Sequence, residues 1–180
     1  MNKVYLLPDK LPRIVALAVV IVINFVLQST VFQYIEVLGV KPNTALVLIC
    51  GYGVLRGDLE GAFFGFFAGL FQDVYYGTVI GFSAMLGMLT GFFCGKPLKD
   101  FYRENYFLPM LLVAASTFVY QFVYYISFFL FRGKVNFAFY LNTIIFPGVV
   151  YTTASSLPVY GVIYLVNKKL EAYEKKWGRL

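Results

Sequence analysis

The sequence contains no histidine, and only 13% of its 180 residues are charged, about half the fraction found in soluble domains. Without His the chain has no Ser-His or Cys-His nucleophile pair, no His proton shuttle and no His metal ligand. Two cysteines, Cys50 and Cys94, do not make a zinc site by themselves. Both lie in apolar runs, so we expect them to be small buried hydrophobic residues.

Hydrophobic residues, by contrast, make up 60% of the chain, and the mean hydropathy is +0.74. A soluble domain of this size could not bury so much apolar surface. The same composition excludes disordered, collagen-like and disulfide-rich scaffolds. We therefore predict an all-α polytopic membrane protein with a single transmembrane domain.

The stretches without charged residues define the expected membrane spans. They are Ile14–Ile35, Pro42–Leu55, Gly61–Gln72, Val74–Gly95, Asn105–Phe131 and Val135–Asn167. Four of these runs reach the length of about 20 apolar residues that a helix needs to cross a bilayer. None of the runs alternates strictly between apolar and polar residues, so helices are expected.

The second and third runs are too short to cross a bilayer by themselves. One solution is two short helices, roughly Pro42–Gly57 and Asp58–Tyr76, with Arg56, Asp58 and Glu60 reaching toward the membrane surface at the turn. The other solution is a re-entrant hairpin, which is tolerated only where protein surrounds it. We favour the first solution and expect six transmembrane helices, of which the second and third are short.

Lysine and arginine predict the orientation of these spans. With the N-terminus inside, only Lys41, Arg132 and Lys134 of the 15 basic residues fall in outer segments. The bias places both termini in the cytoplasm. The net charge of +6 is then explained by membrane topology and anionic lipid rather than by nucleic acid.

Glycines recur every four residues in the segment GDLEGAFFGFFAGLFQD. The members of this glycine stripe are Gly57, Gly61, Gly65 and Gly69, and the same register continues through Asp73 and Gly77. A second stripe on the fourth span consists of Gly87, Gly91 and Gly95. Small residues at this spacing let two helix backbones touch. The stripe predicts either packing between neighbouring spans or a docking groove for the transmembrane helix of a partner.

Asp73 is the only acidic residue in the interior of the Gly61–Gly95 region. A carboxylate near hydrocarbon is costly and is a candidate functional residue for that reason. It is either a solvated residue at a helix end, or a partner for Arg132, Lys134 or a basic group on another chain. No second acid lies at membrane depth, so paired catalytic carboxylates are not expected.

Other polar residues within the spans are amides. Asn24 and Gln28 share one face of the first span and can form hydrogen bonds across a helix interface. Gln121 lies near Tyr124 and Tyr125 on the fifth span. This group predicts either a satisfied packing network or the lining of a small ligand cavity.

The C-terminal segment has a helical pattern of its own. Every third or fourth residue from Val166 to Leu180 is apolar or aromatic, and the remaining surface is basic. We expect a transmembrane domain over residues 1–167 and a basic amphipathic cytoplasmic tail over 168–180. A frayed end of the last span, or a helix that pairs with a cytoplasmic partner, is the alternative. The tail is expected to contact lipid through Lys168, Lys169, Lys175, Lys176 and Trp177.

Three segments together resemble the MreD family, the small polytopic membrane proteins of the bacterial rod-shape, or elongation, machinery. They are LQST in the first span, LGVKPNTALVL at the start of the second, and GAFFGFFAGLFQDVYYGTVIG from the third into the fourth. The resemblance covers nearly the whole chain in the number and order of spans. The glycine-rich segment that ends in Asp73 and Gly77 is its most specific part.

The resemblance implies a non-enzymatic scaffold without a cofactor in the bacterial inner membrane. MreD-like proteins bind the single-span protein MreC and help couple wall-synthesis enzymes, a transpeptidase and a glycosyltransferase, to the elongation complex. They are also distantly similar to the substrate-binding subunits of energy-coupling-factor transporters. That second likeness implies an alternative function as a small-molecule-binding subunit, with the cluster around Gln121 lining the cavity.

Overall fold

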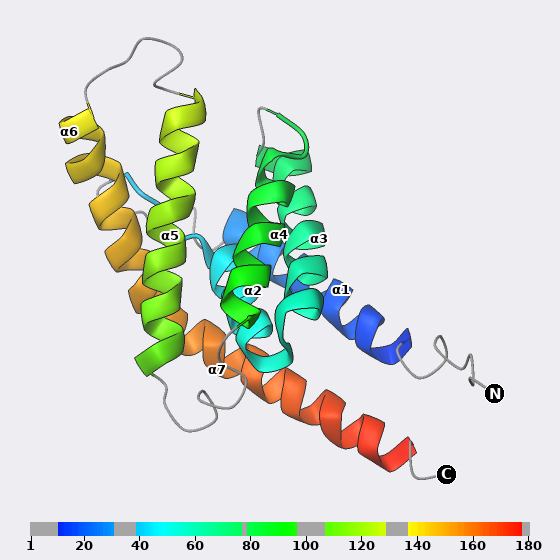
Figure 1. Cartoon of the computed structure of the whole chain (residues 1–180). Helices are drawn as coiled ribbons and strands as arrows, with labels where there is room; N and C mark the ends of the chain where they lie inside the picture. Colours follow the sequence, from blue (N-terminus) through cyan, green and yellow to red (C-terminus); the bar gives the residue numbers. More distant parts are fainter. Residues whose placement is uncertain (1–10, 31–38, 77–78, 97–106, 129–136, 178–180) are drawn as a thin grey trace.

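The structure is a computed structural model that describes residues 11–30, 39–76, 79–96, 107–128 and 137–177 (Figure 1). Its helices are α1 (Leu11–Thr30), α2 (Thr44–Arg56), α3 (Asp58–Tyr76), α4 (Phe82–Gly95), α5 (Phe107–Phe128), α6 (Phe137–Tyr140), the π-helical turn η2 (Leu141–Ile145) and α7 (Phe146–Trp177). The last three follow one another without a break. Counted as one, they bring the described residues to six helices, which confirms the predicted number of helices.

Within the described ranges, three helical segments are long and apolar enough to cross a membrane. They are Arg13–Thr30, Pro109–Phe128 and Phe137–Ala172. α2 and α4 are shorter apolar helices of 13 and 14 residues, which gives each a length of about 20 Å. α3 has 19 residues. The second and the fourth of the six helices are therefore the shortest. The sequence analysis instead predicted that the second and the third would be short.

The fourth helix is short because α3 takes the first part of its charge-free run. α3 continues to Tyr76, and α4 begins only at Phe82. Gly81 precedes α4 with a φ of 98°, a left-handed conformation that glycine adopts without steric cost. Charge-free length does not reveal this turn, because the turn is marked by glycine and not by a charged residue.

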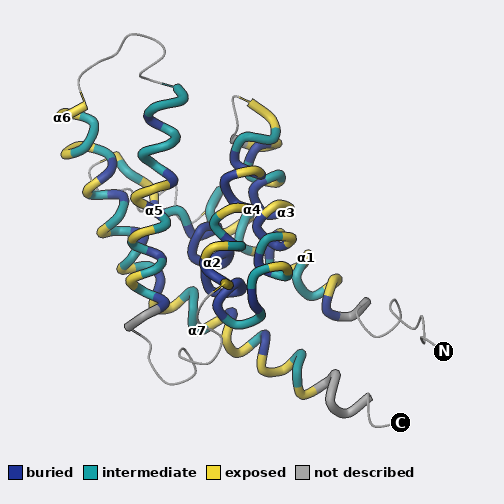
Figure 2. The backbone as a smooth tube through the Cα atoms, viewed as in Figure 1, coloured by how far each residue is buried: buried dark blue, intermediate teal, exposed yellow. Residues whose placement is uncertain are grey.

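α2 forms the centre of the molecule (Figure 2). Every residue from Thr44 to Val54 is buried, and α2 contacts α1, α3, α4, α5 and α7. A helix with apolar residues on all sides is stable where other helices surround it. At its start, the Asn43 side chain accepts a hydrogen bond of 3.2 Å from the Leu46 N–H, which satisfies one of the free amides of the first turn.

The core consists of three apolar clusters around α2. The first joins α1, α2, α3 and α7, the second joins α2, α4 and α5, and the third joins α2, α4 and α5 nearer the start of α2. Cys50 and Cys94 meet in the second cluster, with their Sγ atoms 3.4 Å apart. Both are buried free thiols, which confirms the expectation that they are small core residues.

α7 continues beyond Asn167 to Trp177 as one helix. Residues 168–177 of the predicted tail therefore continue the last helix, and 178–180 lie outside the described residues. Pro158 lies inside α7 and removes the backbone hydrogen bond to the carbonyl four residues earlier. The helix changes direction along its length, and its end lies on the same side of the molecule as the start of α1 (Figure 1).

Candidate functional site in the helix bundle

The glycine stripe of α3 packs directly on α4. Gly61, Gly65 and Gly69 are all buried. A Cβ atom added to Gly61 would lie 2.7 Å from the carbonyl oxygen of Gly91, and one added to Gly65 would overlap the carbonyl of Gly87. The two helices are antiparallel neighbours (Figure 1), so each step of four along α3 meets a step of four back along α4. The contact is thus backbone against backbone, as in small-xxx-small interfaces.

The same interface extends to α2 and to the turn after it. Gly57 has a φ of 101° and donates a hydrogen bond of 2.7 Å to the carbonyl of Gly53. A Cβ atom added to Gly95 would overlap the Gly57 carbonyl, and one added to Gly53 would lie 2.7 Å from the Gly91 oxygen. The stripe is therefore a packing surface within the fold and does not form an open groove, because α4 covers it. Gly77 lies outside the described residues.

Asp73 joins the end of α3 to the start of α4. Its side chain is only 1% exposed. One carboxylate oxygen accepts hydrogen bonds from the N–H groups of Gly81 (2.8 Å) and Ala84 (3.1 Å), and the other accepts one from Ser83 (3.1 Å). These amides belong to the first turn of α4, where a negative charge is favourable. Of the two alternatives, the solvated helix-end residue is therefore wrong, because Asp73 is a buried helix cap. Arg132 and Lys134, the basic partners in the other alternative, lie outside the described residues.

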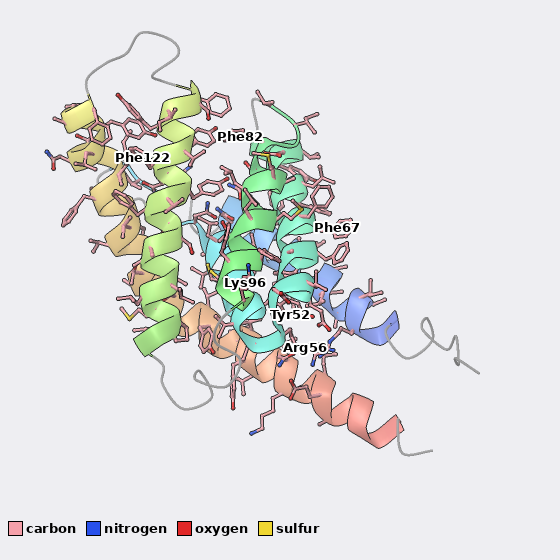
Figure 3. The ribbon with its side chains drawn as sticks, viewed as in Figure 1. Tyr52, Arg56, Phe67, Phe82, Lys96 and Phe122 are labelled. Carbon is pink, nitrogen blue, oxygen red and sulfur yellow. The ribbon has the colours of Figure 1, made fainter. Side chains whose placement is uncertain are left out.

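A charged network lies at the end of α2. Arg56 donates to both carboxylate oxygens of Glu60, at 2.9 Å from Nε and 3.3 Å from Nη2. The hydroxyl of Tyr52 donates to the same carboxylate at 3.2 Å. Figure 3 shows Tyr52 and Arg56 together at this end of the bundle. A bidentate arginine–carboxylate pair fixes the orientation of both side chains.

The network continues to α1 and α7. Arg13 is 6% exposed, lies 4.0 Å from the Glu60 carboxylate and donates a 3.4 Å hydrogen bond to Asn167. Asn167 donates to Glu171 at 2.9 Å, and Glu171 lies 3.6 Å from Arg56. Four helices are thus linked through two arginines and two glutamates.

The sequence predicts Arg56 and Glu60 at a solvated turn but does not reveal this network. Arg13 and Asn167 lie 154 residues apart, so no local pattern connects them. The one available signal is the spacing of four residues between Arg56 and Glu60, which favours a helical ion pair.

The basic residues near the end of α7 face outward where the structure describes them. Lys168 and Lys169 are exposed, while Glu171 is turned toward Arg56. The side chains of Lys175, Lys176 and Trp177 lie outside the described residues. Contact of this segment with lipid remains a prediction.

The aromatic cluster around Gln121 is a packed layer between α5 and the last helix. A Cβ atom added to Gly148 would overlap the amide of Gln121. The Tyr125 ring is buried against Phe137 and Tyr140, with ring centroids 5.4 and 4.6 Å away. This arrangement favours the packing network over the ligand cavity. The Gln121 carbonyl oxygen is buried without a hydrogen bond to any described residue.

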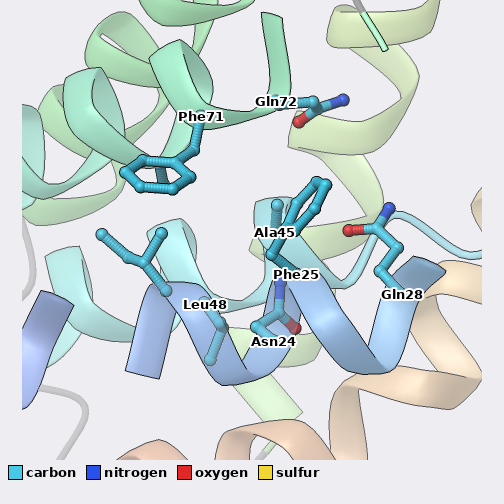
Figure 4. A pocket seen from close by; sticks show the side chains of 9 residues that line it. Asn24, Phe25, Gln28, Ala45, Leu48, Phe71 and Gln72 are labelled. Atoms are coloured by element: carbon cyan, nitrogen blue, oxygen red, sulfur yellow. The ribbon is translucent and has the colours of Figure 1, made fainter. Parts of the chain in front are cut away.

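Asn24 and Gln28 face a small hollow between α1, α2 and α3 (Figure 4). The lining residues are Ile21, Asn24, Phe25, Gln28, Ala45, Leu48, Ala68, Phe71 and Gln72. Its volume of about 10 Å³ is close to the space that one water molecule needs. A second hollow between α5 and α7 has a volume of about 60 Å³.

Large apolar side chains cover the outer surface of the described helices. On α3 they include Phe63, Phe66, Phe67 and Phe71, and Figure 3 shows Phe67 on the side of α3 that faces away from α4. α1 and α7 expose valine, isoleucine and leucine side chains in the same way. Such a surface is stable in lipid, whereas a soluble monomer rarely exposes large apolar patches. The fold and surface therefore define a polytopic α-helical membrane protein.

Comparison with known families identifies the particular class. A family model described as rod shape-determining protein MreD matches residues 9–169. The chain therefore belongs to the MreD family, and its role lies in rod shape determination. No curated protein and no solved structure matches the chain.

Proposed function

We propose that this protein is a non-enzymatic scaffold of the bacterial elongation complex in the inner membrane. It binds a single-span MreC-like protein and helps couple the wall-synthesis transpeptidase and glycosyltransferase to that complex. The observation that carries this proposal is the division of α3 into two faces. Its glycine face packs on α4, whereas its phenylalanine face is exposed.

The exposed phenylalanines supply what a membrane helix partner requires. Helices in lipid associate through close packing and hydrogen bonds, without a hydrophobic driving force. Phe63, Phe67 and Phe71 follow one another at intervals of four residues and form a ridge along α3. Aromatic side chains offer large contact areas, and they are enriched at protein interfaces.

The charged network supports the proposed orientation with both termini in the cytoplasm. The hydrogen bond between Arg13 and Asn167 joins the start of α1 to the C-terminal part of α7. Lys168 and Lys169 are exposed beside this network. Basic residues concentrate on the cytoplasmic side of membrane proteins, so this end of the bundle is the one that we assign to the cytoplasm.

A function as a substrate-binding subunit of an energy-coupling-factor transporter has less support. That likeness depends on the number of helices. The two hollows described above have volumes of about 10 and 60 Å³, whereas small-molecule pockets have about 300–1,000 Å³. The residues around Gln121 line neither of these hollows.

Affinity purification tests the proposal. Tagged protein is extracted from native membranes of a rod-shaped bacterium in mild detergent, and the bound proteins are identified by mass spectrometry. We expect a single-span MreC-like protein together with wall-synthesis enzymes. Recovery of an ATPase pair with a coupling transmembrane subunit, and no single-span protein, would contradict the proposal.

A matched pair of variants sharpens this experiment. Phe67→Ala removes part of the ridge, and Phe146→Ala removes an equally apolar side chain from α7. The two positions are 54% and 68% exposed, so neither change should disturb the core. We expect Phe67→Ala to lower the recovery of the single-span protein and Phe146→Ala to leave it unchanged.

A further inference from the structure

α1 is the least enclosed of the long helices in the described part of the chain. Only 11% of the residues in Arg13–Thr30 are buried, compared with 22% in Pro109–Phe128. α1 contributes Ile21 to the first core cluster and packs there on α2 and α3. The other residues of α1 from Ile14 to Thr30 are exposed or half-buried. Because α1 is held along one edge, its flank beside α3 is accessible from the surrounding membrane.

The hollow on this flank contains amides with unused hydrogen-bonding groups. Among the described residues, the amide of Asn24 has no hydrogen-bond partner. Gln28 uses its carbonyl oxygen to accept a 3.5 Å bond from Thr44, and Gln72 uses its NH₂ group to donate a 3.5 Å bond to Tyr120. The NH₂ group of Gln28 and the carbonyl oxygen of Gln72 form no hydrogen bond with a described residue. Polar groups left unpaired in hydrocarbon are costly.

These groups define the chemistry of an occupant. The hollow offers both donors and acceptors, so it suits a hydroxyl, which can donate and accept at once. A volume of about 10 Å³, close to the space that one water molecule needs, admits a hydroxyl group but not a lipid headgroup. Phe25 and Phe71 lie beside the amides and give the hollow an apolar rim (Figure 4). Where helices pack side by side, a side chain of one helix inserts into a hole between residues of the helix surface that it faces.

We propose that this hollow is the docking position of the partner's transmembrane helix. The partner helix lies along α1 and the phenylalanine ridge of α3. It inserts the hydroxyl group of one serine or threonine between Asn24, Gln28 and Gln72. This inference depends on the proposed function, because the occupant is the helix of the single-span protein.

Site-specific photo-crosslinking locates the occupant. Benzoylphenylalanine replaces Phe71 at the rim, where the change keeps an aromatic ring, and replaces Phe146 of α7 in the control. Both full-length proteins are irradiated in native membranes, and the crosslinked peptides are identified by mass spectrometry. We expect the probe at position 71 to capture the transmembrane segment of the single-span protein, with a serine or threonine in the captured turn. The probe at position 146 should not capture it.

Asn24→Leu tests the hydrogen bonds themselves. The change replaces the amide with an apolar side chain that has the same number of non-hydrogen atoms, and Val22→Leu on the exposed flank of α1 is the control. Loss of one interhelical hydrogen bond should reduce recovery of the partner about threefold, with no change for Val22→Leu. Both variants should unfold in detergent at the temperature of the unmodified protein.

Each outcome has a distinct meaning. Crosslinks from position 71 only to lipid or to this chain, or normal recovery with Asn24→Leu, would overturn the docking position while the proposed function stands. If the unmodified protein recovers no single-span protein at all, the proposed function fails and the docking position fails with it.

Discussion

The two sides of α3 differ in how they meet their neighbours. Toward α4, glycines bring the backbones together so closely that added Cβ atoms would overlap carbonyl groups. Toward α1, side chains meet instead, as in the contact between the Phe25 and Tyr75 rings with centroids 4.1 Å apart, and a hollow remains. Because membrane helices gain stability mainly from packing, we infer that the α4 side maintains the fold and that the α1 side is available for another helix.

Of the substitutions considered, Gly65→Leu should lower the free energy of unfolding the most. The new side chain would overlap the Gly87 backbone, so α3 and α4 would have to separate. We expect a loss of about 3 kcal/mol or more in the free energy of unfolding, at the upper end for overpacked cores. The measurement is the reaction of the buried thiols Cys50 and Cys94 with a maleimide dye during heating in detergent.

Gly161→Ala is the matched control for this prediction. A Cβ atom added at Gly161 of α7 meets nothing within 4 Å. The thiols should therefore become reactive at the same temperature as in the unmodified protein, or slightly above it, since alanine favours helix. Equal losses from Gly65→Leu and Gly161→Ala would contradict the special role of the α3–α4 interface.

Asp73→Ala should have the next largest effect. Two of the amides that Asp73 accepts from, those of Ser83 and Ala84, are in buried residues and would lose their partner. We expect a loss of about 3 kcal/mol, from about 1–3 kcal/mol for each unsatisfied buried group. Asp73→Asn keeps an accepting oxygen and should lose less. Identical thermal unfolding of the two variants would show that the carboxylate cap is not what holds this turn.

Glu171→Gln should have the smallest effect of the three. It weakens the ion pair with Arg56, whose partners are about one-fifth and one-third exposed, so we expect a loss of about 0.5–1 kcal/mol that decreases with added salt. Lys169→Gln, two residues away on the exposed side of α7, is the control. A loss above that range, unaffected by salt, would mean that Glu171 acts through more than this pair.

The sequence was sufficient for those features that depend on local spacing. Glycines at intervals of four residues predict one flat helix face, and the bounds of α2 and α3 follow from Arg56–Asp58 and the flanking apolar runs. The partner of that face was not predictable, because packing within the chain and docking of another chain require the same small residues. The role of Asp73 depends on a turn that brings residues 81–84 back to it, and the Arg13–Asn167 contact depends on the whole bundle.

The central claim is that the two sides of α3 have different roles. Its most direct test compares Gly65→Ala with Asn24→Leu in two measurements on the same samples. One is the temperature at which the buried thiols become reactive, and the other is the amount of single-span protein recovered per folded molecule. We expect Gly65→Ala to lower the temperature, and Asn24→Leu to leave the temperature unchanged while recovery decreases about threefold. If Asn24→Leu lowers the temperature as Gly65→Ala does, and recovery per folded molecule stays constant, both sides of α3 serve only the fold and the central claim is wrong.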